Sequence, residues 1–481
     1  MTKLEAAKLP SGWALTTIGD VVEPKVSQDG PSRGHDFTYV DISSVSNTTK
    51  RIAAPKTLPR LEAPSRARQN LKAGDVLVSM TRPNLNAVAL VPQALEGSVG
   101  STGFDVLRTR AVNPRWLYCF VQTSGFIHAM SSKVLGALYP AVRPKDIRDY
   151  PLPLAPLPEQ RRIVEAIESN FARLDEAKSS LTRAKTNLKA YRATVLKTAF
   201  EGQLVPQDPR DVPASQLLER NWQGSHEGHH GTERGAGEVM SGTVPHDTTP
   251  YPLSGRWEWE RLGVVAEVIT EGTDPRKSPT MLHIAPDNIE SSTGRLLPCR
   301  TVKEDQVVSN NFRFTKGDVL YTKLRPYLNK VVVAPFDGLC SSDVLPIRAR
   351  IDTSYLRYWM LSPRFLSQVI PRQTGVTLPR VSRKSLTETF VPVAPLPEQR
   401  RIVTEVERLL SFADEVDRMI NVEQERAASI RQSVLKSAFE GQLVPQDPSD
   451  EPASVLLERI KRERSSPSQS MTRNRKTPRA T

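Results

Sequence analysis

Apolar side chains recur every seven residues along two stretches of the chain, residues 158–201 and 397–440. Spacing of this kind is typical of helices that pair as a coiled coil. At 1.5 Å per residue, each stretch would form a helix about 66 Å long. The first carries the spacing at Ile167, Leu174, Leu181, Leu188 and Val195, with a weaker companion series at Ile163, Ala177, Ala184 and Tyr191. The second carries it at Val406, Ala413, Ile420, Ala427 and Val434, with companions at Ile402, Leu409, Val416 and Ile430.

The ends of the two stretches carry helix signals as well. Pro158 and Pro397 stand where a first helical turn accommodates proline, because the N–H groups of that turn have no partner inside the helix. Glu159 follows Pro158 and complements the positive end of the helix dipole. Gly202 and Pro206 end the first stretch. Helices of this length without a core of their own are expected to pair with each other.

The helical stretches belong to a longer internal repeat. Residues 155–220 align with residues 394–459 without a gap, and 36 of the 66 aligned residues are identical. The identities concentrate at the two ends, in APLPEQRRIV and AFEGQLVPQDP, whereas the middle keeps the apolar spacing more than the letters. A period this long lies outside the range of solenoid repeats, so the chain contains one large duplicated unit.

Residues 11–154 and 254–393 have a different pattern, with short apolar runs interrupted by Gly, Pro and Asn. Such runs predict mixed domains that contain short strands. Within the first domain, residues 114–130 have apolar positions at helical spacing and predict one helix. The two domains differ most in residues 28–70 and 270–312, where we expect them to diverge in function.

Two shorter blocks show that the mixed domains share a frame. KAGDVLVSMTRPNLNAVALVP at 72–92 matches TKGDVLYTKLRPYLNKVVVAP at 315–335, and GALYPAVRPKDI at 136–147 matches GVTLPRVSRKSL at 375–386. The predicted fold class is therefore α+β, with two mixed α/β domains that are each followed by a long helix. The expected boundaries are 11–154 and 254–393 for the domains, 155–205 and 394–445 for the helical segments, 206–253 for a flexible linker, and 446–481 for a basic, disordered tail.

The linker is rich in Gly, Thr, His and Pro. Its three clustered histidines could bind a metal ion, but without a scaffold to fix ligand geometry we expect a solvated linker and no metal site. These histidines are His226, His229 and His230. The cysteines, Cys119, Cys299 and Cys340, form no CxxC or CxxH pair, so we predict free thiols in a reducing compartment.

Composition narrows the class of partner. The 481 residues carry a net charge of +13, and each mixed domain carries +6. A positive balance favours a polyanion, either an acidic membrane or nucleic acid. No run of 18 apolar residues and no apolar signal core occurs in the sequence, so we expect a cytoplasmic protein with nucleic acid as its partner.

Motifs for catalysis are missing from the sequence. It contains no G-x-x-x-x-G-K-[ST] loop, no G-x-G-x-x-G after a strand, no H-E-x-x-H and no G-x-S-x-G. It also contains no Asn/Asp-Pro-Pro-Tyr/Phe segment of the kind that amino-methyltransferases use to hold a target base. Acidic pairs such as Asp175–Glu176 and Asp414–Glu415 lie on the predicted helices and are expected to be solvated. The sequence therefore predicts a non-catalytic protein that binds no cofactor.

Binding chemistry concentrates in two places in each domain. The first is the shared TRPNLN and YTKLRPYLNK frame, where arginine and asparagine could read guanine and adenine by bidentate hydrogen bonds. Because two different domains need not read the same bases, phosphate contact or a purely structural turn is the preferred interpretation of the positions that the domains share. The candidates in this frame are Arg82, Asn84 and Asn86 in the first domain, and Lys323, Arg325, Tyr327, Asn329 and Lys330 in the second.

The second place is a basic loop just before each long helix. A solvated turn and a DNA contact both remain open for it. The candidates are Tyr139, Arg143 and Lys145, and in the second domain Arg372, Gln373, Thr374, Thr377, Arg380, Arg383 and Lys384. In the divergent segments, Lys50 and Arg51 or Arg276 and Lys277 mark where sequence readout should differ.

The arrangement of two different domains, each followed by a near-identical helix that begins PLPEQRRIV, resembles the specificity subunits of type I restriction-modification systems. The resemblance covers almost the whole chain and is carried by the PLPEQRRI blocks, the AFEGQLVP blocks and the GDVL…RP frames. It implies two target recognition domains, each reading one half of a split DNA sequence. It also implies helices that pair antiparallel, with pseudo-two-fold symmetry, and set the spacing between the half-sites.

The resemblance further implies partners. Two methyltransferase subunits would dock on the helices, restriction subunits would join through them, and S-adenosylmethionine, ATP and Mg²⁺ would bind to those partners. The residues expected in helix pairing and partner binding are Pro158, Glu159, Gln160, Ile163, Ile167, Leu174, Leu181, Leu188, Val195 and Phe200 in the first copy, and Pro397, Glu398, Gln399, Ile402, Val406, Ala413, Ile420, Val434 and Phe439 in the second.

Elementary geometry supports the same arrangement. Antiparallel helices would place the domains at opposite ends about an approximate two-fold axis, which duplex DNA also has. Helices about 66 Å long limit the half-site separation to less than about two turns of duplex. A stand-alone two-domain DNA-binding regulator with a self-associating coiled coil remains an alternative, and neighbouring genes for a methyltransferase would decide between them. An RNA-binding scaffold is less favoured, because no aromatic stacking motif is visible.

Overall fold

The computed structural model describes residues 9–31, 36–134, 140–219, 249–374 and 377–465. These residues form two compact units. The first unit contains Met1–Leu181 together with Val422–Thr481, and the second contains Thr182–Asn421. Each long helix, α5 (Leu157–Phe200) and α11 (Leu396–Phe439), therefore contributes to both units.

The first unit contains a three-stranded antiparallel sheet and a four-stranded mixed sheet. The three-stranded sheet has the order β10 (Phe104–Leu107), β7 (Val76–Ser79), β8 (Val88–Leu90). The four-stranded sheet has the order β5 (Lys56–Leu58), β2 (Phe37–Val40), β9 (Val99–Ser101), β6 (Ala67–Asn70), and only β2 and β9 pair in parallel. Two short pairs complete the set, β1 (Ala14–Thr17) with β11 (Pro151–Leu154) and β3 (Val45–Ser46) with β4 (Arg51–Ile52).

Short helices lie between these strands and at the end of the chain's described part. The α-helices of the first unit besides the long pair are α1 (Ile18–Val21), α2 (Pro114–Phe120), α3 (Ser124–Ser132), α4 (Pro144–Arg148) and α12 (Ala453–Ser465). The 3₁₀ turns are η2 (Ile42–Ser44), η3 (Arg60–Glu62), η4 (Pro83–Leu85) and η5 (Gln93–Leu95).

The second unit repeats this plan. A four-stranded antiparallel sheet has the order β13 (Ala266–Val268), β21 (Val344–Ala349), β18 (Val319–Thr322), β19 (Val331–Val333). A five-stranded sheet has the order β14 (Gly272–Thr273), β17 (Asn311–Phe314), β20 (Gly338–Ser341), β15 (Leu282–Ile284), β16 (Arg300–Thr301), and β12 (Glu258–Arg261) pairs with β22 (Phe390–Val393). The helices are α7 (Leu262–Val265), α8 (Thr353–Leu361), α9 (Pro363–Val369) and α10 (Arg383–Thr387), with 3₁₀ turns η7 (Pro275–Lys277), η8 (Pro286–Asn288), η9 (Pro326–Leu328) and η10 (Ile370–Arg372).

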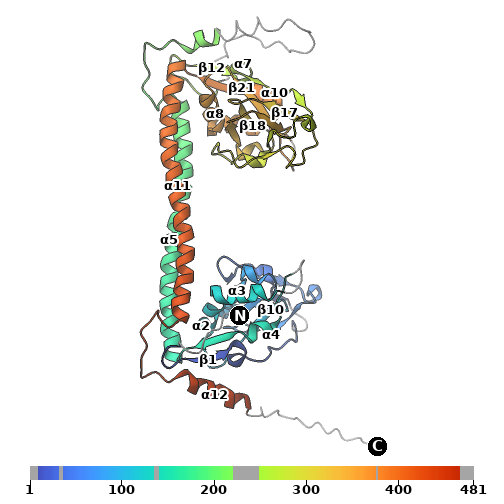
Figure 1. The fold of residues 1–481 in the computed structure, drawn as a ribbon, viewed down its shortest axis with the longest axis vertical. Coiled ribbons are helices and arrows are strands. Elements are labelled where there is room, and N and C mark those ends of the chain that lie inside the picture. Colours follow the sequence, from blue (N-terminus) through green and yellow to red (C-terminus); the bar gives the residue numbers. More distant parts are fainter. Residues whose placement is uncertain (1–8, 32–35, 135–139, 220–248, 375–376, 466–481) are drawn as a thin grey trace, which may run out of the picture. The chain divides into compact units, whose positions relative to one another are not determined.

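In the second unit, α8 packs on the sheet that contains β18 and β21 (Figure 1). The core there is strongly aromatic, because Tyr355 and Trp359 of α8 are fully buried together with Tyr321 of β18. The aspartate of each GDVL frame is buried just before a strand, β7 or β18, and forms an ion pair with an arginine. Asp75 forms a buried ion pair with Arg108 at 2.8 Å, and Asp318 forms the corresponding pair with Arg348 at 3.1 Å.

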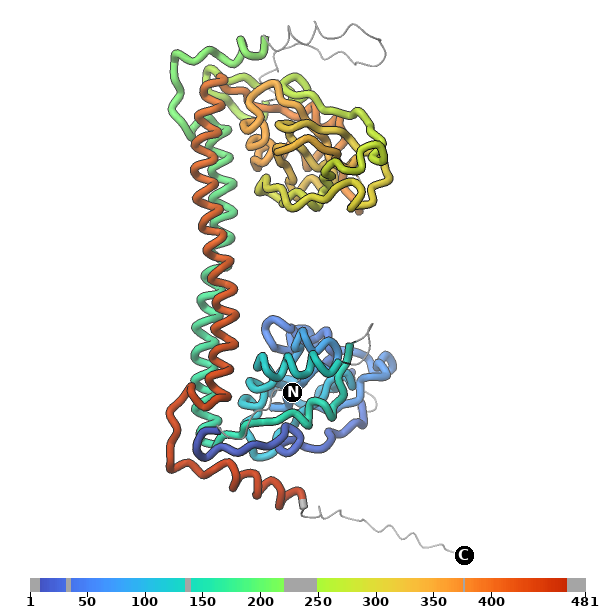
Figure 2. Tube along the Cα trace, in the orientation of Figure 1, coloured from blue at the N-terminus to red at the C-terminus, as the bar shows by residue number. Residues whose placement is uncertain are grey.

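The expected antiparallel pairing of α5 and α11 is confirmed, and Figure 2 shows the two helices side by side. In the first unit, Arg431 of α11 contacts Asp175 of α5 at 2.5 Å. In the second unit, Lys185 donates to Asn421 at 2.9 Å. Within the second unit Arg192 also pairs with Asp414 at 2.5 Å, so residue numbers rise along one helix as they fall along the other, which defines antiparallel pairing. Along α11 the heptad positions Val406, Ala413 and Ile420 are buried.

Three expectations from the sequence need correction. Residues 114–130 form two helices: α2 ends at Phe120, and Thr123 begins α3 by accepting a capping hydrogen bond from the Phe126 N–H at 3.3 Å. The tail predicted as disordered from residue 446 contains α12, whose Leu456 and Ile460 are buried in the core of the first unit. The predicted linker is ordered where it is described, at 206–219 and 249–253: residues 214–219 are helical.

Candidate nucleic-acid interface

The shared TRPNLN and LRPYLN frames fold into the same turn in both domains. Arg82 and Asn86 flank η4 and have left-handed backbones, with φ of 47° and 46°. Arg325 and Asn329 flank η9 in the same way, with φ of 49° and 46°. Non-glycine residues rarely adopt this conformation, so its recurrence at both ends of both turns shows a conserved local geometry. We call residues 82–86 and 325–329 the contact turns.

Asn86 and Asn329 fit the structural interpretation of the shared turn and not the base-reading one. Both side chains are buried, at 6% and 3% exposure. The Asn86 amide donates to the Val121 carbonyl at 2.8 Å, and the Asn329 amide donates to the Leu361 carbonyl at 2.9 Å. Each amide thus ties a contact turn to the end of a core helix, α2 or α8. Buried amides held in this way do not reach a DNA base.

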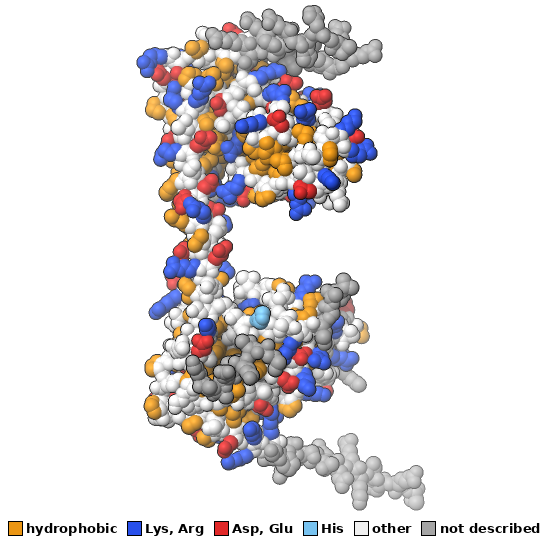
Figure 3. Space-filling view, viewed as in Figure 1, with side chains coloured by type: hydrophobic (Ala, Val, Ile, Leu, Met, Phe, Trp, Pro, Cys, Tyr) orange, Lys and Arg blue, Asp and Glu red, His pale blue; other side chains and the backbone are white. Residues whose placement is uncertain are grey.

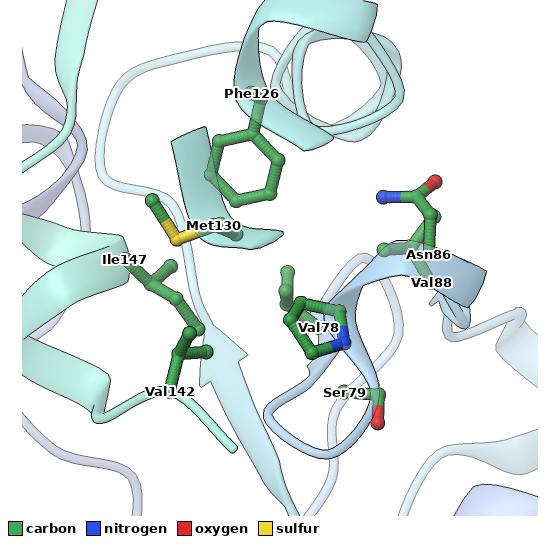
Figure 4. Close-up of a pocket in the computed structure, with 9 residues that line it drawn as sticks. Val78, Ser79, Asn86, Val88, Phe126, Met130, Val142 and Ile147 are labelled. Atoms are coloured by element: carbon green, nitrogen blue, oxygen red, sulfur yellow. The ribbon is translucent and has the colours of Figure 1, made fainter. Parts of the chain in front are cut away.

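A small cavity lies beneath the contact turn of the first domain (Figure 4). Its wall is mostly apolar, and its volume is about 10 Å³, roughly the size that admits one water molecule. A nucleobase does not fit. The lining residues are Pro83 and those labelled in Figure 4, which are Val78, Ser79, Asn86, Val88, Phe126, Met130, Val142 and Ile147.

Backbone pairing brings each contact turn next to the basic loop of the same domain. In the first domain the Arg82 N–H donates to the Pro140 carbonyl at 2.8 Å. In the second domain the Arg325 N–H donates to the Pro379 carbonyl at 2.7 Å, and the Val381 N–H donates to the Lys323 carbonyl at 3.1 Å. The two groups of candidates that the sequence kept apart therefore form one basic edge per domain.

Most of the remaining candidates are solvent-exposed on these edges. Arg143 pairs with Asp146 at 3.1 Å and Arg380 with Asp343 at 3.5 Å, so part of their charge is already balanced. Lys330 donates to the Pro286 carbonyl at 2.6 Å and holds a loop. Tyr139 lies outside the described residues. The exposed candidates are Arg82, Asn84, Arg143, Lys145, Arg325, Tyr327, Thr374, Thr377, Arg380, Arg383 and Lys384, and Lys323, Lys330, Arg372 and Gln373 are partly exposed.

Charged side chains of both signs are scattered over the visible face of the domains, among uncharged ones (Figure 3). Lysine and arginine are spread among acidic and apolar side chains and do not form one continuous patch in this view. The exposed arginines of the contact turns are therefore stronger evidence for a binding site than the net charge of the domains. Lys50, taken from the divergent segment, is half-buried below the first contact turn, and burial lowers its pKa to about 8.

The identical ends of the repeat have a role that the sequence did not indicate. Glu159 and Gln160 are 1% and 0% exposed. Trp13 donates to the Glu159 carboxylate at 3.0 Å, and Gln160 accepts from the Asn113 N–H at 3.0 Å while donating to the Ala155 carbonyl at 2.8 Å. These side chains join the start of the helix to its own domain and are not available to a partner subunit.

Glu398 and Gln399 repeat this joint in the second unit and are 1% and 0% exposed. Gln399 accepts from the Asp352 N–H at 3.0 Å and donates to the Ala394 carbonyl at 2.7 Å. The PEQ motif of both copies was expected to take part in helix pairing and partner binding. Its burial against the preceding domain corrects that assignment for these four residues.

The other identical end, AFEGQLVP, packs against the opposite domain. Phe439, near the end of α11, contacts Trp116 and Phe120 of the first domain, with ring centroids 5.2 and 5.1 Å apart. Phe200, near the end of α5, contacts Tyr355 and Trp359 of the second domain in the same way, at 5.1 and 5.2 Å. Each domain core is therefore completed by the helix that follows the other domain.

Ion pairs follow the same crosswise rule. Arg162 at the start of α5 pairs with Asp450 at 2.7 Å, and Arg401 at the start of α11 pairs with Asp211 at 2.6 Å. Arg401 and Asp450 are the repeat counterparts of Arg162 and Asp211. The two units thus repeat the same joint with the partners exchanged.

The described residues hold neither a metal-binding cluster nor a thiol of lowered pKa, because burial raises the pKa of all three cysteines. They include no cluster of three or more His, Cys, Asp or Glu side chains that could hold a metal ion. Burial raises the pKa of the Cys119 thiol to about 12, and Cys340 is also fully buried. The predicted linker histidines, His226, His229 and His230, lie outside the described residues. In the same residues, every helix is too short or too polar to cross a bilayer.

These features define a duplicated protein in which two mixed α/β domains are joined by a pair of long antiparallel helices. No protein-family model matches the sequence. The chain is 32% identical over 369 residues to the specificity subunit of the type I restriction enzyme EcoDI from Escherichia coli. The matched region covers 75% of this chain and 78% of that protein. It is 24% identical over 503 residues to the StySPI specificity subunit from Salmonella potsdam, covering 96% and 97%.

A solved structure agrees with these relatives. A chain from work on complex assembly and conformational transition of the type I R-M system superimposes with a TM-score of 0.67 and 25% identity, covering 90% of this chain and 99% of that one. The chain belongs to the family of type I restriction enzyme specificity subunits. It is a non-catalytic subunit, as its sequence predicted. A stand-alone regulator is not favoured.

Proposed function

We propose that the chain reads a split DNA target through two basic edges, one per domain, each built from a contact turn and the neighbouring basic loop. The observation that carries this proposal is the exposed arginine of each turn, Arg82 and Arg325, held by an unusual backbone on a buried asparagine anchor. Such preorganised arginines suit phosphate contact, and sequence readout would come from the divergent residues around them.

The domain boundaries follow from the same proposal. Residues 11–154 and 254–393 would be the target recognition domains, and 155–205 and 394–445 the spacer helices that set the distance between half-sites. Two methyltransferase subunits would dock on the helices, with restriction subunits bound through them. S-adenosylmethionine, ATP and Mg²⁺ would bind those partners, and the complex would act on DNA in the cytoplasm.

Because the PEQ joints are buried, the partner surface is better sought on the exposed helix faces. Phe412 and Met419 of α11 are one heptad apart and 64% and 57% exposed. Exposed apolar side chains at this spacing mark a protein contact. Their counterparts in α5 are Arg173 and Ser180, so a second partner copy would meet different chemistry there.

A charge on this surface tests the docking proposal. We expect Phe412→Glu to remain folded, since the side chain is exposed, but to reduce copurification of the methyltransferase subunit about tenfold or more. Ser411→Glu, which adds the same charge at an exposed position about 100° round the helix, serves as the matched control. Undiminished copurification of Phe412→Glu would remove this surface from the proposal.

The complete function is tested by mapping methylated adenines in host DNA with and without the gene. We expect one split motif whose methylation disappears on deletion, and no methylation by the purified chain alone with S-adenosylmethionine. Methylation by the isolated chain, or a continuous motif, would contradict the proposal.

A further inference from the structure

The divergent segments of the two domains share more structure than their sequences indicate. Residues 39–52 and 283–296 align without a gap. In both, a strand leads into a 3₁₀ turn, η2 or η8, and then into a short antiparallel bridge, Val45 with Ile52 in one domain and Ile289 with Leu296 in the other. In this alignment Lys50 corresponds to Gly294.

Lys50 and Gly294 both have left-handed backbones, with φ of 56° and 70°. Glycine adopts this conformation without steric cost, whereas a lysine is strained there. A strained residue that persists where its counterpart is glycine points to a role for the side chain.

The Lys50 ammonium group lies under the first contact turn. Its Nζ donates to the Asn86 carbonyl at 2.6 Å and is 3.4 Å from the Leu85 carbonyl. Tyr118 of α2 fixes the backbone of the same residue by donating its hydroxyl to the Lys50 carbonyl at 2.7 Å. The side chain therefore braces the turn that presents Arg82, and it faces the protein instead of solvent.

The second domain supports its contact turn with a different pair of residues at the corresponding positions. Arg357 is the counterpart of Tyr118, and its Nη2 donates to the Gly294 carbonyl at 3.2 Å. A side chain at residue 294 would collide with this guanidinium, because a Cβ there would lie 2.6 Å from Nη2. The Asn329 carbonyl accepts instead from the Ser292 N–H at 3.0 Å. One domain thus carries Lys50 with Tyr118, and the other carries Gly294 with Arg357.

We infer that Lys50 is a positioning residue for DNA recognition by the first domain: it holds the contact turn in shape and does not itself touch DNA. The inference rests on the proposed function of that turn. A basic residue near DNA can either contact a phosphate or support the protein's own structure. Phosphate contact releases counterions, whereas structural support does not, so the salt dependence of binding distinguishes the two roles.

The test uses Lys50→Gly, which introduces the residue of the second domain and relieves the backbone. Binding of the full-length chain to a random-sequence duplex pool is measured over a series of salt concentrations, and bound sequences are selected and read. We expect about tenfold weaker binding and loss of sequence information in one half-site only, with an unchanged slope of affinity against salt. Arg82→Ala, the matched control, should lower that slope by about one.

The double variant Lys50→Gly with Tyr118→Arg recreates the pair of the second domain and should recover most of the lost affinity. Wild-type affinity in Lys50→Gly, a slope lowered by about one, or a lower melting temperature than that of the wild type would each overturn the inference. Failure of the wild-type chain to select a split sequence would instead overturn the proposed function and the inference with it.

Discussion

Asparagine at the end of each contact turn combines two properties that the turn requires. It tolerates a left-handed backbone better than most residues, and its amide reaches a carbonyl at the end of a core helix. The sequence suggested base reading for Asn86 and Asn329 because asparagine is a common adenine reader. Because both domains share these positions, phosphate contact or a structural turn was the preferred interpretation, and the burial of both amides supports the structural turn.

Substitution of Asn86 should lower the stability of the fold and leave the electrostatic contribution to DNA binding unchanged. We expect Asn86→Ala to lower the free energy of unfolding of the first unit by about 2 kcal/mol, since the Val121 carbonyl loses a buried donor and alanine disfavours the backbone. Chemical denaturation measures the loss. The slope of DNA affinity against salt should not change in this variant, and a slope lowered by about one would show that Asn86 contacts a phosphate after all.

Lys50 gives the first unit a pH dependence of defined sign. Burial and the nearby Arg431 lower its pKa to about 8, whereas lysine in an unfolded chain titrates near about 10.4. Between these values the unfolded chain binds more protons than the folded one, so stability from this residue rises with pH. Unfolding of the wild type and of Lys50→Met should therefore diverge in favour of the wild type from about pH 8 to about pH 10. A constant difference would contradict the lowered pKa.

At the scale of elements, the long helices and the joints at their ends are the main features. The helices were predictable, because a heptad spacing and end signals are local properties of the sequence. The joints were not. The identity of PEQ and AFEGQLVP in both copies showed that these segments matter, but no local pattern shows that Glu159 is buried against Trp13 or that Phe439 completes the first domain.

The ion pairs between the start of each long helix and the segment after the other helix allow the stability of this contact to be measured. Arg162 and Asp450 are 33% and 9% exposed at their side chains, so the pair is only partly screened. We expect Arg162→Ala to destabilise the first unit by about 1 kcal/mol, and the double variant with Asp450→Ala to lose less than the sum of the single variants. The same cycle on Arg401 and Asp211 reports on the second unit and serves as its control. Strict additivity in both cycles would show that the pairs do not stabilise the joint.

At the scale of the whole molecule, the repeat predicted a duplicated architecture and family resemblance predicted its class. The shared frame of the divergent segments was missed, because structure persisted there after almost all identity was lost between residues 39–52 and 283–296. The short helix α12 was also missed. Its sequence resembles a charged tail, and only its packing against the first unit explains why Leu456 and Ile460 are apolar.

Lengthening the helix pair tests the proposed spacing role. Because Lys185 lies opposite Asn421, one heptad inserted between Lys185 and Thr186 and another between Ile420 and Asn421 preserves both the pairing and the seam. Each helix grows by about 10 Å, or about three base pairs of duplex. Methylation mapping should show a longer spacer and unchanged half-sites. Changed half-sites with an unchanged spacer would contradict the spacing role, and insertion in one helix alone should break the pairing.

The division of the chain into a continuous second unit and a discontinuous first unit has a consequence for synthesis on the ribosome. Residues 182–421 emerge together, so the second unit can fold as soon as its last residue leaves the exit tunnel. The first domain is synthesised earlier, but Trp116 and Phe120 cannot make their ring contacts until Phe439 is synthesised. The core of the first unit is likewise incomplete until Leu456 and Ile460 are present. The domain translated first is thus the last to mature, and an incomplete chain exposes aromatic surface that invites chaperones or proteolysis.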